Sequence, residues 1–515
     1  MSSKKEKGTG KREGKGEGDG KAVGVGKGEG DGKAVGVGKG EGDIGVFIFR
    51  RDLRLEDNVG LTLLLEKTKR IIPLFVFTPE QIGKGNRYKS DNAIGFMVES
   101  LHELEKEITK RGKGGKGINY ALSTNLEAVS NLIRDGVHGE KIRYLGFNLD
   151  WTPYAKKRDA EILNLCKSNN IEVITGEDYT LHPMGTLLKS DQSVFKVYGP
   201  FRKNAEKLES QIPKPVKFNP RGITWIYPFT ISNVVDPSLG LSSYYTDSPE
   251  RLCHASREVA LAILKDIKSS QSSYSSSRDS LVYQTTHLSS YLKFGNVSIR
   301  EAYHSFKAGL ERSNGLFNQL YWKEFYVYIG HYLPHVLKGQ SMKPEYDKIT
   351  WTNNPRIFDA WCRGMTGFPI VDAGMRELNA TGYMHNRSRL ITSGFLVKLA
   401  IVDWKKGERY FAQKLTDYDP AQNNGGWQWS SGSGADSQPY FRILSPISQA
   451  TKFDPEAAYI KKWCPELKDV PPRHLHDWEK YNSQYPKIDY PCPCLDYKRA
   501  RATVMAVYKK GLGRE

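Results

Sequence analysis

The segment QNNGGWQW, from Gln422 to Trp429, gathers side chains that suit ligand binding and redox chemistry. Its amides can donate and accept hydrogen bonds, its two indoles can stack on a planar group, and its paired glycines let the backbone approach a ligand closely. The carboxylates of Asp417 and Asp419 precede it. We therefore expect this segment to line a site for a planar, polar ligand.

A second run, NQLYWKEFY, has the apolar periodicity of a helix. Gln319, Trp322, Lys323 and Tyr326 fall at i, i+3, i+4 and i+7, so they share one face of that helix. Aromatic faces usually pack into a core. A Gln and a Lys on such a face also suit a ligand that needs stacking together with hydrogen bonds.

A third run, MHNRSR, places Asn386 and Arg389 three residues apart on another helix, with Arg387 turned away from Arg389. A helix with solvated arginines would show the same letters. The carboxylates of Asp417 and Asp419 favour a site, because an arginine beside a carboxylate keeps both groups ionised and oriented.

The elements that would position these side chains fall into two regions. From Ile44 to about Asp178, short β-rich runs alternate with amphipathic helical runs, which predicts an α/β fold with a doubly wound parallel sheet. Ligands of such sheets bind at the carboxyl ends of the strands, where FRRDLRLEDN (Phe49 to Asn58) would lie. The expected strands cover residues 46–49, 71–77, 118–122, 142–147 and 171–175.

The C-terminal region is expected to be all-α, because Gly or Pro separates runs of helical periodicity at 299–310, 316–333, 369–382 and 388–404. Residues from about 185 to 278 carry scattered Pro and Ser and predict a long connection with little regular structure. The repeated unit GKGEGDGKAVGV near the start has almost nothing to bury, so it predicts a disordered tail. The expected organisation is a Gly-rich repeat tail at 1–43, an α/β domain at 44–184, an interdomain connection at 185–270 and a helical domain at 271–515.

Composition narrows the classes of function. The chain carries 76 Lys and Arg against 58 Asp and Glu, a formal charge of +18, which favours a polyanionic partner such as nucleic acid. Its six cysteines are scattered and indicate a reducing compartment, and Cys492-Pro-Cys494 lacks the spacing of a zinc site. No run of about 18 apolar residues is present. We expect a soluble intracellular protein, cytoplasmic or nuclear, without a metal.

Several of these stretches together resemble the photolyase/cryptochrome flavoprotein family, and most of all its class I cyclobutane pyrimidine dimer (CPD) DNA photolyases. The resemblance runs from about Ile44 to the end of the chain. It rests on FRRDLRLEDN, TTHLSSYLKFGNVS, YWKEFY, TGFPIVDAGMRELNATGYMHNRSR and the segment from Asp419 through YFRILSPISQATKFDPEAAYIKKW.

The resemblance implies that the helical domain binds FAD. Asn423 matches the residue that faces flavin N5, where a neutral amide can accept from the protonated N5 of a reduced flavin. The hydroxyls and N–H groups of the 285–289 segment suit the FAD phosphates. The matched cofactor positions are Tyr274, Thr285, Thr286, His287, Leu288, Ser289, Lys323, Asn386, Arg389, Asp417, Asp419 and Asn423.

The activity that the resemblance implies is light-driven DNA repair by a deoxyribodipyrimidine photo-lyase. Excited FADH⁻ would donate an electron to the dimer, the cyclobutane ring would split, and the electron would return to the flavin. Trp351, Trp404 and Trp427 match the family's relay of electrons to oxidised flavin. The lesion would leave the duplex to reach the flavin, as photolyases require. The matched lesion and DNA positions are Arg278, Gln319, Trp322, Asn386, Arg387, Leu390, Trp429 and Gln449.

The chain departs from the class I pattern at Gln319, where those enzymes usually carry a Glu and where Gln is typical of (6-4) photolyases and animal cryptochromes. Leu390 replaces a frequent Met, and Tyr383 replaces a Trp. Paired histidines are typical of (6-4) photolyases in the MHNRSRL segment, where this chain has only His385. The CPD is therefore the expected lesion.

The alternatives are a cryptochrome-type blue-light photoreceptor and a (6-4) photolyase. Photoreceptors of that type commonly carry a long C-terminal extension, so the end at Glu515 favours repair. The α/β domain is expected to hold a second, antenna chromophore, for which folate, deazaflavin and flavin types stay open. We expect the protein to act as a monomer on UV-damaged DNA.

Overall fold

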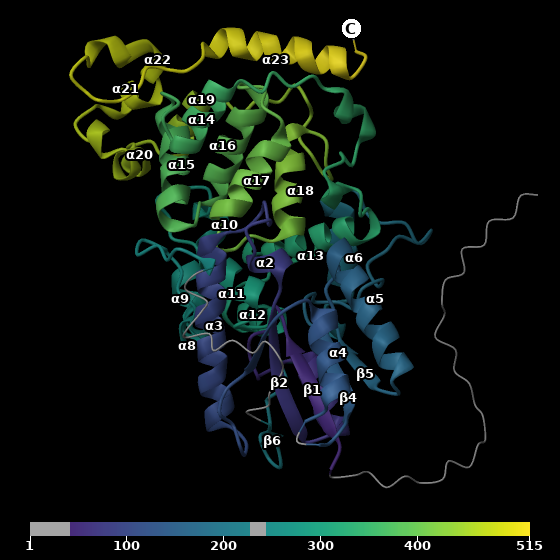
Figure 1. Cartoon of the computed structure of the whole chain (residues 1–515). Coiled ribbons are helices and arrows are strands. Elements are labelled where there is room, and N and C mark those ends of the chain that lie inside the picture. Colours follow the sequence, from purple (N-terminus) through teal and green to yellow (C-terminus); the bar gives the residue numbers. More distant parts are fainter. Residues whose placement is uncertain (1–41, 138, 227–243, 515) are drawn as a thin grey trace, which may run out of the picture. The chain divides into compact units, whose positions relative to one another are not determined.

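The computed structural model describes residues 42–137, 139–226 and 244–514 (Figure 1). Almost all of the predicted tail at 1–43 lies outside these residues. Five parallel strands pair in the order β3-β2-β1-β4-β5, and the short strand β6 pairs with β2. The strands are β1 (Ile44–Phe49), β2 (Arg70–Phe77), β3 (Asn119–Leu122), β4 (Ile142–Asn148), β5 (Glu172–Gly176) and β6 (Thr224–Trp225).

The sheet is buried on both faces, which explains why its strands read as continuous apolar runs. Alternate residues of β1 enter different cores: Phe47 and Phe49 belong to one, and Val46 and Ile48 to the other. The helices around the sheet are α1 (Val59–Lys67), α2 (Pro79–Ile82), α3 (Asp91–Lys110), α4 (Asn125–Asp135) and α5 (Pro153–Ser168). The predicted α/β fold with a doubly wound parallel sheet is confirmed, and so are its five main strands.

The stretch from 185 to 278 is more regular than predicted. It contains α6 (Tyr198–Lys207), α8 (Arg257–Lys265), α9 (Ile267–Gln271) and α10 (Tyr274–Ser277) besides β6. The prediction took serine as a sign of irregular structure, but serine also begins helices. The side chain of Ser256 caps α8 by accepting from the backbone N–H of Val259. The proposed domain boundaries within this stretch stay predictions.

In the described part of the C-terminal region, from Leu288 on, the regular elements are all helices, as expected. The predicted helix at 388–404 is wrong in one respect, because α16 ends at Lys398, the chain turns through Ile401 at φ 52°, and Asp403 caps a new helix. The helices are α11 (Leu288–Phe294), α12 (Ile299–Gly309), α13 (Leu316–Tyr332), α14 (Pro355–Arg363), α15 (Pro369–Thr381), α16 (Asn386–Lys398), α17 (Trp404–Lys414), α18 (Pro420–Ser431), α19 (Pro446–Phe453), α20 (Ala458–Trp463), α21 (Pro472–His476), α22 (Trp478–Tyr481) and α23 (Tyr497–Gly511). Within the described ranges no helix is both long and apolar enough to cross a membrane.

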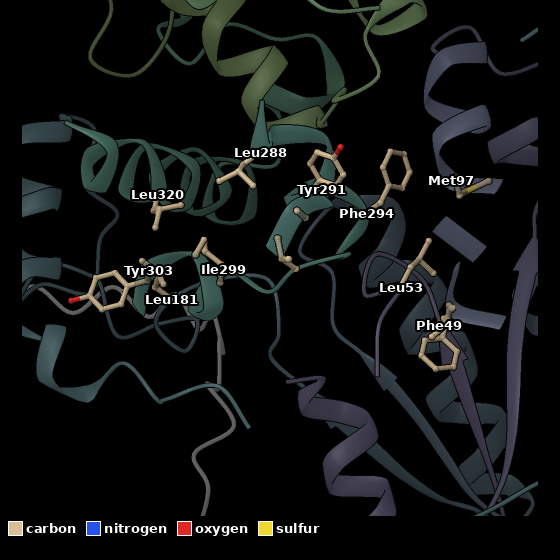
Figure 2. Packing of buried hydrophobic residues seen from close by; sticks show 14 of the residues in the cluster. Phe49, Leu53, Met97, Leu181, Leu288, Tyr291, Phe294, Ile299, Tyr303 and Leu320 are labelled. Carbon is tan, nitrogen blue, oxygen red and sulfur yellow. The ribbon is translucent and has the colours of Figure 1, made fainter. Parts of the chain in front are cut away.

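A shared hydrophobic core joins the sheet to helices of the C-terminal region. Phe49 and Leu53, at the end of β1 and just beyond it, belong to the same cluster as Leu288, Phe294 and Leu320 from α11 and α13 (Figure 2). The carboxyl end of β1 is thereby held against the helices that carry the predicted site.

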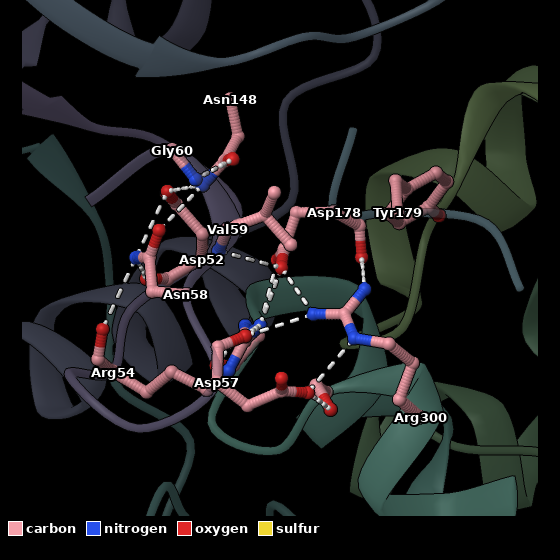
Figure 3. A network of polar contacts seen from close by, with 12 residues as sticks. Asp52, Arg54, Asp57, Asn58, Val59, Gly60, Asn148, Asp178, Tyr179 and Arg300 are labelled. Carbon is pink, nitrogen blue, oxygen red and sulfur yellow. Dashed lines mark hydrogen bonds and ion pairs between the residues drawn. The ribbon is translucent and has the colours of Figure 1, made fainter. Parts of the chain in front are cut away.

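A buried polar network reinforces this connection (Figure 3). Asp178 accepts from Arg54 Nη2 and from Arg300 Nη2, each at 2.7 Å, and Arg300 Nε donates to Asp57 at 3.0 Å. Burial alone would raise the pKa of Asp178, but Arg54 and Arg300 outweigh it and lower the pKa. The ionised carboxylate thus links the segment after β5 to the loop after β1 and to α12.

Candidate functional site

The loop after β1 carries Arg51 to the boundary between the sheet and the helices. Arg51 donates to Asp150 Oδ2 at 2.9 Å and forms an ion pair with Asp419, the residue that opens α18. Its guanidinium lies 3.9 Å from the centre of the Tyr179 ring. The polar segment after β1 therefore contacts the segment that we expected to bind a ligand.

Asp419 itself caps α18. Its Oδ1 accepts from the N–H groups of Ala421 and Gln422 at 3.0 and 3.1 Å, and its Oδ2 accepts from the Tyr179 hydroxyl at 2.5 Å. Burial would raise the pKa of Asp419, but its cationic neighbours, Arg51 foremost, lower the pKa to about 2. The carboxylate is therefore ionised at neutral pH and holds α18 against the edge of the sheet.

Asp417, one of the two carboxylates expected beside an arginine, pairs with Arg389. Arg389, on α16, donates through Nη2 to Asp417 Oδ2 at 2.9 Å and to Oδ1 at 3.2 Å. Arg387 points elsewhere, to Asp279 at 2.7 Å and over the ring of Phe453. The two arginines of MHNRSR thus have separate partners, and only Arg389 faces the acidic segment.

The Asn423 amide has a defined orientation. Its Nδ2 donates to the backbone oxygen of Glu408 at 2.9 Å and to Glu408 Oε1 at 3.3 Å. Both bonds occupy the nitrogen side, which leaves the Oδ1 side of the amide to accept from another donor.

The paired glycines after Asn423 differ from each other. A Cβ at Gly425 would collide with the ring of Tyr326, so this glycine serves the close packing of α18 on α13. A Cβ at Gly426 would meet no protein atom within 4 Å. Only Gly426 therefore keeps the expected role of admitting a ligand.

The aromatic face of α13 contacts the N-terminal part of the chain. Trp322 stacks on Tyr198 with ring centres 3.7 Å apart, so one face of its indole is covered. Lys323 Nζ donates to the backbone oxygen of Tyr179 at 2.8 Å and lies 3.1 Å from the centre of the Tyr179 ring. Burial lowers the pKa of Lys323 to about 7. Gln319 makes one long bond, from Nε2 to the Gly315 oxygen at 3.5 Å.

The three predicted relay tryptophans contact one hydrophobic cluster. Trp427 and Trp404 are 2% and 3% exposed, and Trp351 is half-buried against the same cluster. The ring of Trp427 also contacts the fully buried Trp361, with centres 6.1 Å apart.

Comparisons with known proteins agree with this geometry. Residues 45–218 match a family model described as DNA photolyase, and residues 316–510 match one described as the FAD binding domain of DNA photolyase. A deoxyribodipyrimidine photo-lyase of Escherichia coli is 32% identical to the chain, over 90% of this chain and 97% of that protein. The chain belongs to the DNA photolyase family.

Solved structures of photolyases share the fold. The archaeal photolyase from Sulfolobus tokodaii, whose crystal structure holds two FAD molecules, is 37% identical, has a TM-score of 0.77, and is matched over 91% of this chain and 100% of its own. A class III photolyase from Agrobacterium tumefaciens is 26% identical, has a TM-score of 0.81, and is matched over 91% of this chain and 98% of its own.

The residues present fit the FAD that this photolyase family binds. Burial lowers the pKa of Lys293, on α11, to about 8, and an anionic ligand beside it would raise that pKa again. The buried Nδ1 of His287 and Nε2 of His385 have no hydrogen-bond partner among the described residues, and each could bond to a cofactor. Arg389, Asp417 and Asn423 would meet the flavin side, as the resemblance implied.

The segment expected to contact the FAD phosphates begins α11. Thr285 Oγ1 lies 3.2 Å from the Tyr383 hydroxyl, and Thr286 Oγ1 accepts from the Leu288 N–H at 3.3 Å. His287 adopts the left-handed conformation, at φ 51°, and its ring lies 4.6 Å from that of Tyr383. Of the remaining positions, Leu288 and Tyr274 are buried and Ser289 is exposed.

The predicted DNA-side residues are spread over several helices. Arg278 and Asn386 are exposed. The others are partly covered, and Gln449 also has a buried Oε1 without a partner among the described residues. The partly covered positions are Gln319, Trp322, Arg387, Leu390, Trp429 and Gln449.

Tyr179, Lys293 and Glu408 contact or surround the site and were not identified from the sequence. Tyr179 is 240 positions from Asp419 in the chain, so their bond has no local signal. Lys293 lies in the TTHLSSYLKFGNVS stretch that carried part of the resemblance, which was the one available indication. Glu408 resembles any exposed helix glutamate until the fold is known.

Proposed function

We propose that this protein repairs cyclobutane pyrimidine dimers in DNA in a light-dependent reaction. The observation that carries the proposal is the Asn423 amide, whose nitrogen is bonded to Glu408 while its oxygen side can accept from a protonated flavin N5. Bound reduced FAD would supply the excited electron that splits the dimer. The activity is also the one named for the Escherichia coli relative.

The chain's own residues would hold the lesion and its DNA. The uncovered parts of Trp322 and Trp429 would stack on a dimer that has left the duplex, and the arginines at 278 and 387 would contact phosphates. The formal charge of +18 supports a polyanionic partner.

We propose a monomer in the interior of the cell, consistent with the six free cysteines.

Lesion choice depends on Gln319, whose side chain makes, among the described residues, one long bond to Gly315. An amide here can donate to a base carbonyl, which either lesion offers. The test is to incubate photoreduced protein with oligonucleotides that carry a cyclobutane dimer or a (6-4) product and then illuminate. We expect loss of the cyclobutane dimer. Loss of neither lesion would contradict repair, and loss of only the (6-4) product would make the protein a (6-4) photolyase.

The tryptophan relay gives a prediction that separates photoreduction from repair. Trp427→Phe should slow the light-driven reduction of oxidised FAD at least tenfold, because phenylalanine is much harder to oxidise than an indole, and it should leave repair by chemically reduced protein nearly unchanged. Flavin absorbance and dimer loss measure the two steps. Trp478→Phe is the matched control, because Trp478 is equally buried and donates to the Pro491 oxygen. Equal loss of both activities in Trp427→Phe would make Trp427 structural.

We propose further that an antenna chromophore binds at the carboxyl ends of β1 and β4. Arg50 lies over the ring of Phe147, and its Nε and Nη2 are buried without partners among the described residues, as is Arg158 Nη2. Unfilled guanidinium N–H groups suit an anionic or carbonyl-rich chromophore. Chromatography of the released chromophores against folate, deazaflavin and flavin standards would identify it, and Arg50→Leu should lower its occupancy.

A further inference from the structure

Glu408 is a buried carboxyl group beside the proposed flavin site. It lies on α17, one helical turn after Trp404, and is 5% exposed. Within the described part of the chain it forms no ion pair. Burying a carboxylate that forms no ion pair costs free energy, so its presence here indicates a functional role.

Glu408 has polar neighbours on two sides. On one side it accepts from Asn423 Nδ2, through both its backbone oxygen and Oε1. On the other side lies Tyr88, which lowers the pKa of the Glu408 carboxyl group. Tyr88 belongs to the segment before α3, and its ring stacks on Tyr418 with centres 6.2 Å apart. Glu408 thus lies between Tyr88, from the α/β part of the molecule, and the Asn423 amide.

The charge of Glu408 varies near neutral pH. Burial raises its pKa to about 7, although Tyr88, Asn423 and Arg409 each lower it. Tyr418 is a further titratable group beside it. An ionised Glu408 would accept more strongly from Asn423 Nδ2 than a protonated one, so the amide would be held more firmly above neutral pH.

We propose that Glu408 is a positioning residue that keeps the Asn423 oxygen turned toward the flavin, and that Tyr88 holds Glu408 in place. This inference rests on the proposed binding of FAD beside Asn423. It adds a residue from the α/β part of the chain to the control of the cofactor's surroundings.

The test follows the dark oxidation of bound, chemically reduced flavin by air between pH ~6 and ~8.5, a range that brackets the titration of Glu408. We expect a pH-dependent rate in the wild-type protein. Glu408→Gln should give a flat profile near the wild-type rate at low pH, because a neutral acceptor oxygen remains. Glu408→Ala should give a flat profile at a rate changed about fivefold, the effect of one ordinary hydrogen bond.

Tyr88→Phe and Glu107→Gln complete the design. Because the Tyr88 hydroxyl lowers the pKa of Glu408, Tyr88→Phe should move the midpoint of the profile to higher pH. Glu107, on α3, is another carboxyl group whose pKa burial raises, and its variant should keep the wild-type profile. A wild-type profile in Glu408→Gln would overturn the proposal. If the Glu408 variants do not fold, an unchanged midpoint in Tyr88→Phe overturns it.

The same experiment separates this inference from the proposed function. The dissociation constant of FAD is measured first, on the wild-type apoprotein, and a wild type that binds no FAD would contradict the proposed function itself. A wild type that binds FAD and repairs dimers, with variants that leave the oxidation profile unchanged, would contradict only the role of Glu408.

Discussion

At the scale of single residues, the site depends on ion pairs between side chains that are largely buried. Arg389 and Asp417 illustrate this, because the pKa of Arg389, which burial would lower, is raised by its carboxylate partner. The pair joins α16 to the segment that leads into α18. Removing one partner would leave the other charge unpaired beside the cofactor.

Arg389→Gln should therefore weaken FAD binding by about 30-fold or more, the loss expected when one member of a hydrogen-bonded charge pair is removed at a binding site. Titration of the apoprotein with FAD measures the effect. Arg376→Gln is the matched control, because Arg376 binds Glu466 at 2.8 Å in the same C-terminal region. Equal FAD affinities in the two variants would show that Arg389 does not serve the cofactor.

At the scale of elements, α13, α16, α17 and α18 form the frame of the site, and α13 and α18 are in close contact at Gly425. Tyr326 on α13 lies where a side chain at Gly425 would project. The two adjacent glycines therefore make a matched pair of positions on one helix.

Gly425→Ala should lower the free energy of unfolding by about 1–3 kcal/mol, because the added methyl group overpacks the contact with Tyr326. Gly426→Ala should raise it by about 0.5–1 kcal/mol, because alanine favours a helix and its methyl group meets no protein atom. Denaturant titration of both variants decides the matter. Equal effects, or the opposite order, would refute the packing of α18 described above.

Some of these elements and contacts could be predicted from the sequence, and others could not. The strands were predictable because their apolar runs are continuous, and the Arg389–Asp417 pair was predictable because its residue types have a strong mutual preference. The break between α16 and α17 was not, since the left-handed conformation of Ile401 is imposed by its surroundings. Glu408 and Tyr179 were missed because their bonds join segments whose proximity only the fold creates.

At the scale of the whole molecule, the shared core and the network around Asp178 hold the sheet against the helices. Asp178 carries the negative charge between Arg54 and Arg300. Because its pKa is lowered in the folded protein, its stabilising contribution is present at neutral pH and is lost as the pH falls through that lowered value.

Asp178→Asn should destabilise the protein by about 3–5 kcal/mol at neutral pH, because two buried arginines lose a shared counter-charge. The difference from the wild type should shrink in acid, where wild-type Asp178 becomes protonated as well. Chemical unfolding at several pH values measures both effects. Glu161→Gln, which alters an exposed pair with Lys157, is the control and should leave stability unchanged. A constant difference at every pH would show that the charge of Asp178 is not what stabilises the fold.

We infer that the FAD-loaded protein splits cyclobutane dimers with an electron that returns to the flavin. The most direct measurement counts the dimers split per bound FAD when chemically reduced protein is illuminated without oxygen and without further reductant. We expect many dimers to be split per flavin in the light and none in the dark. At most one dimer per flavin, or equal loss in the dark, would contradict it.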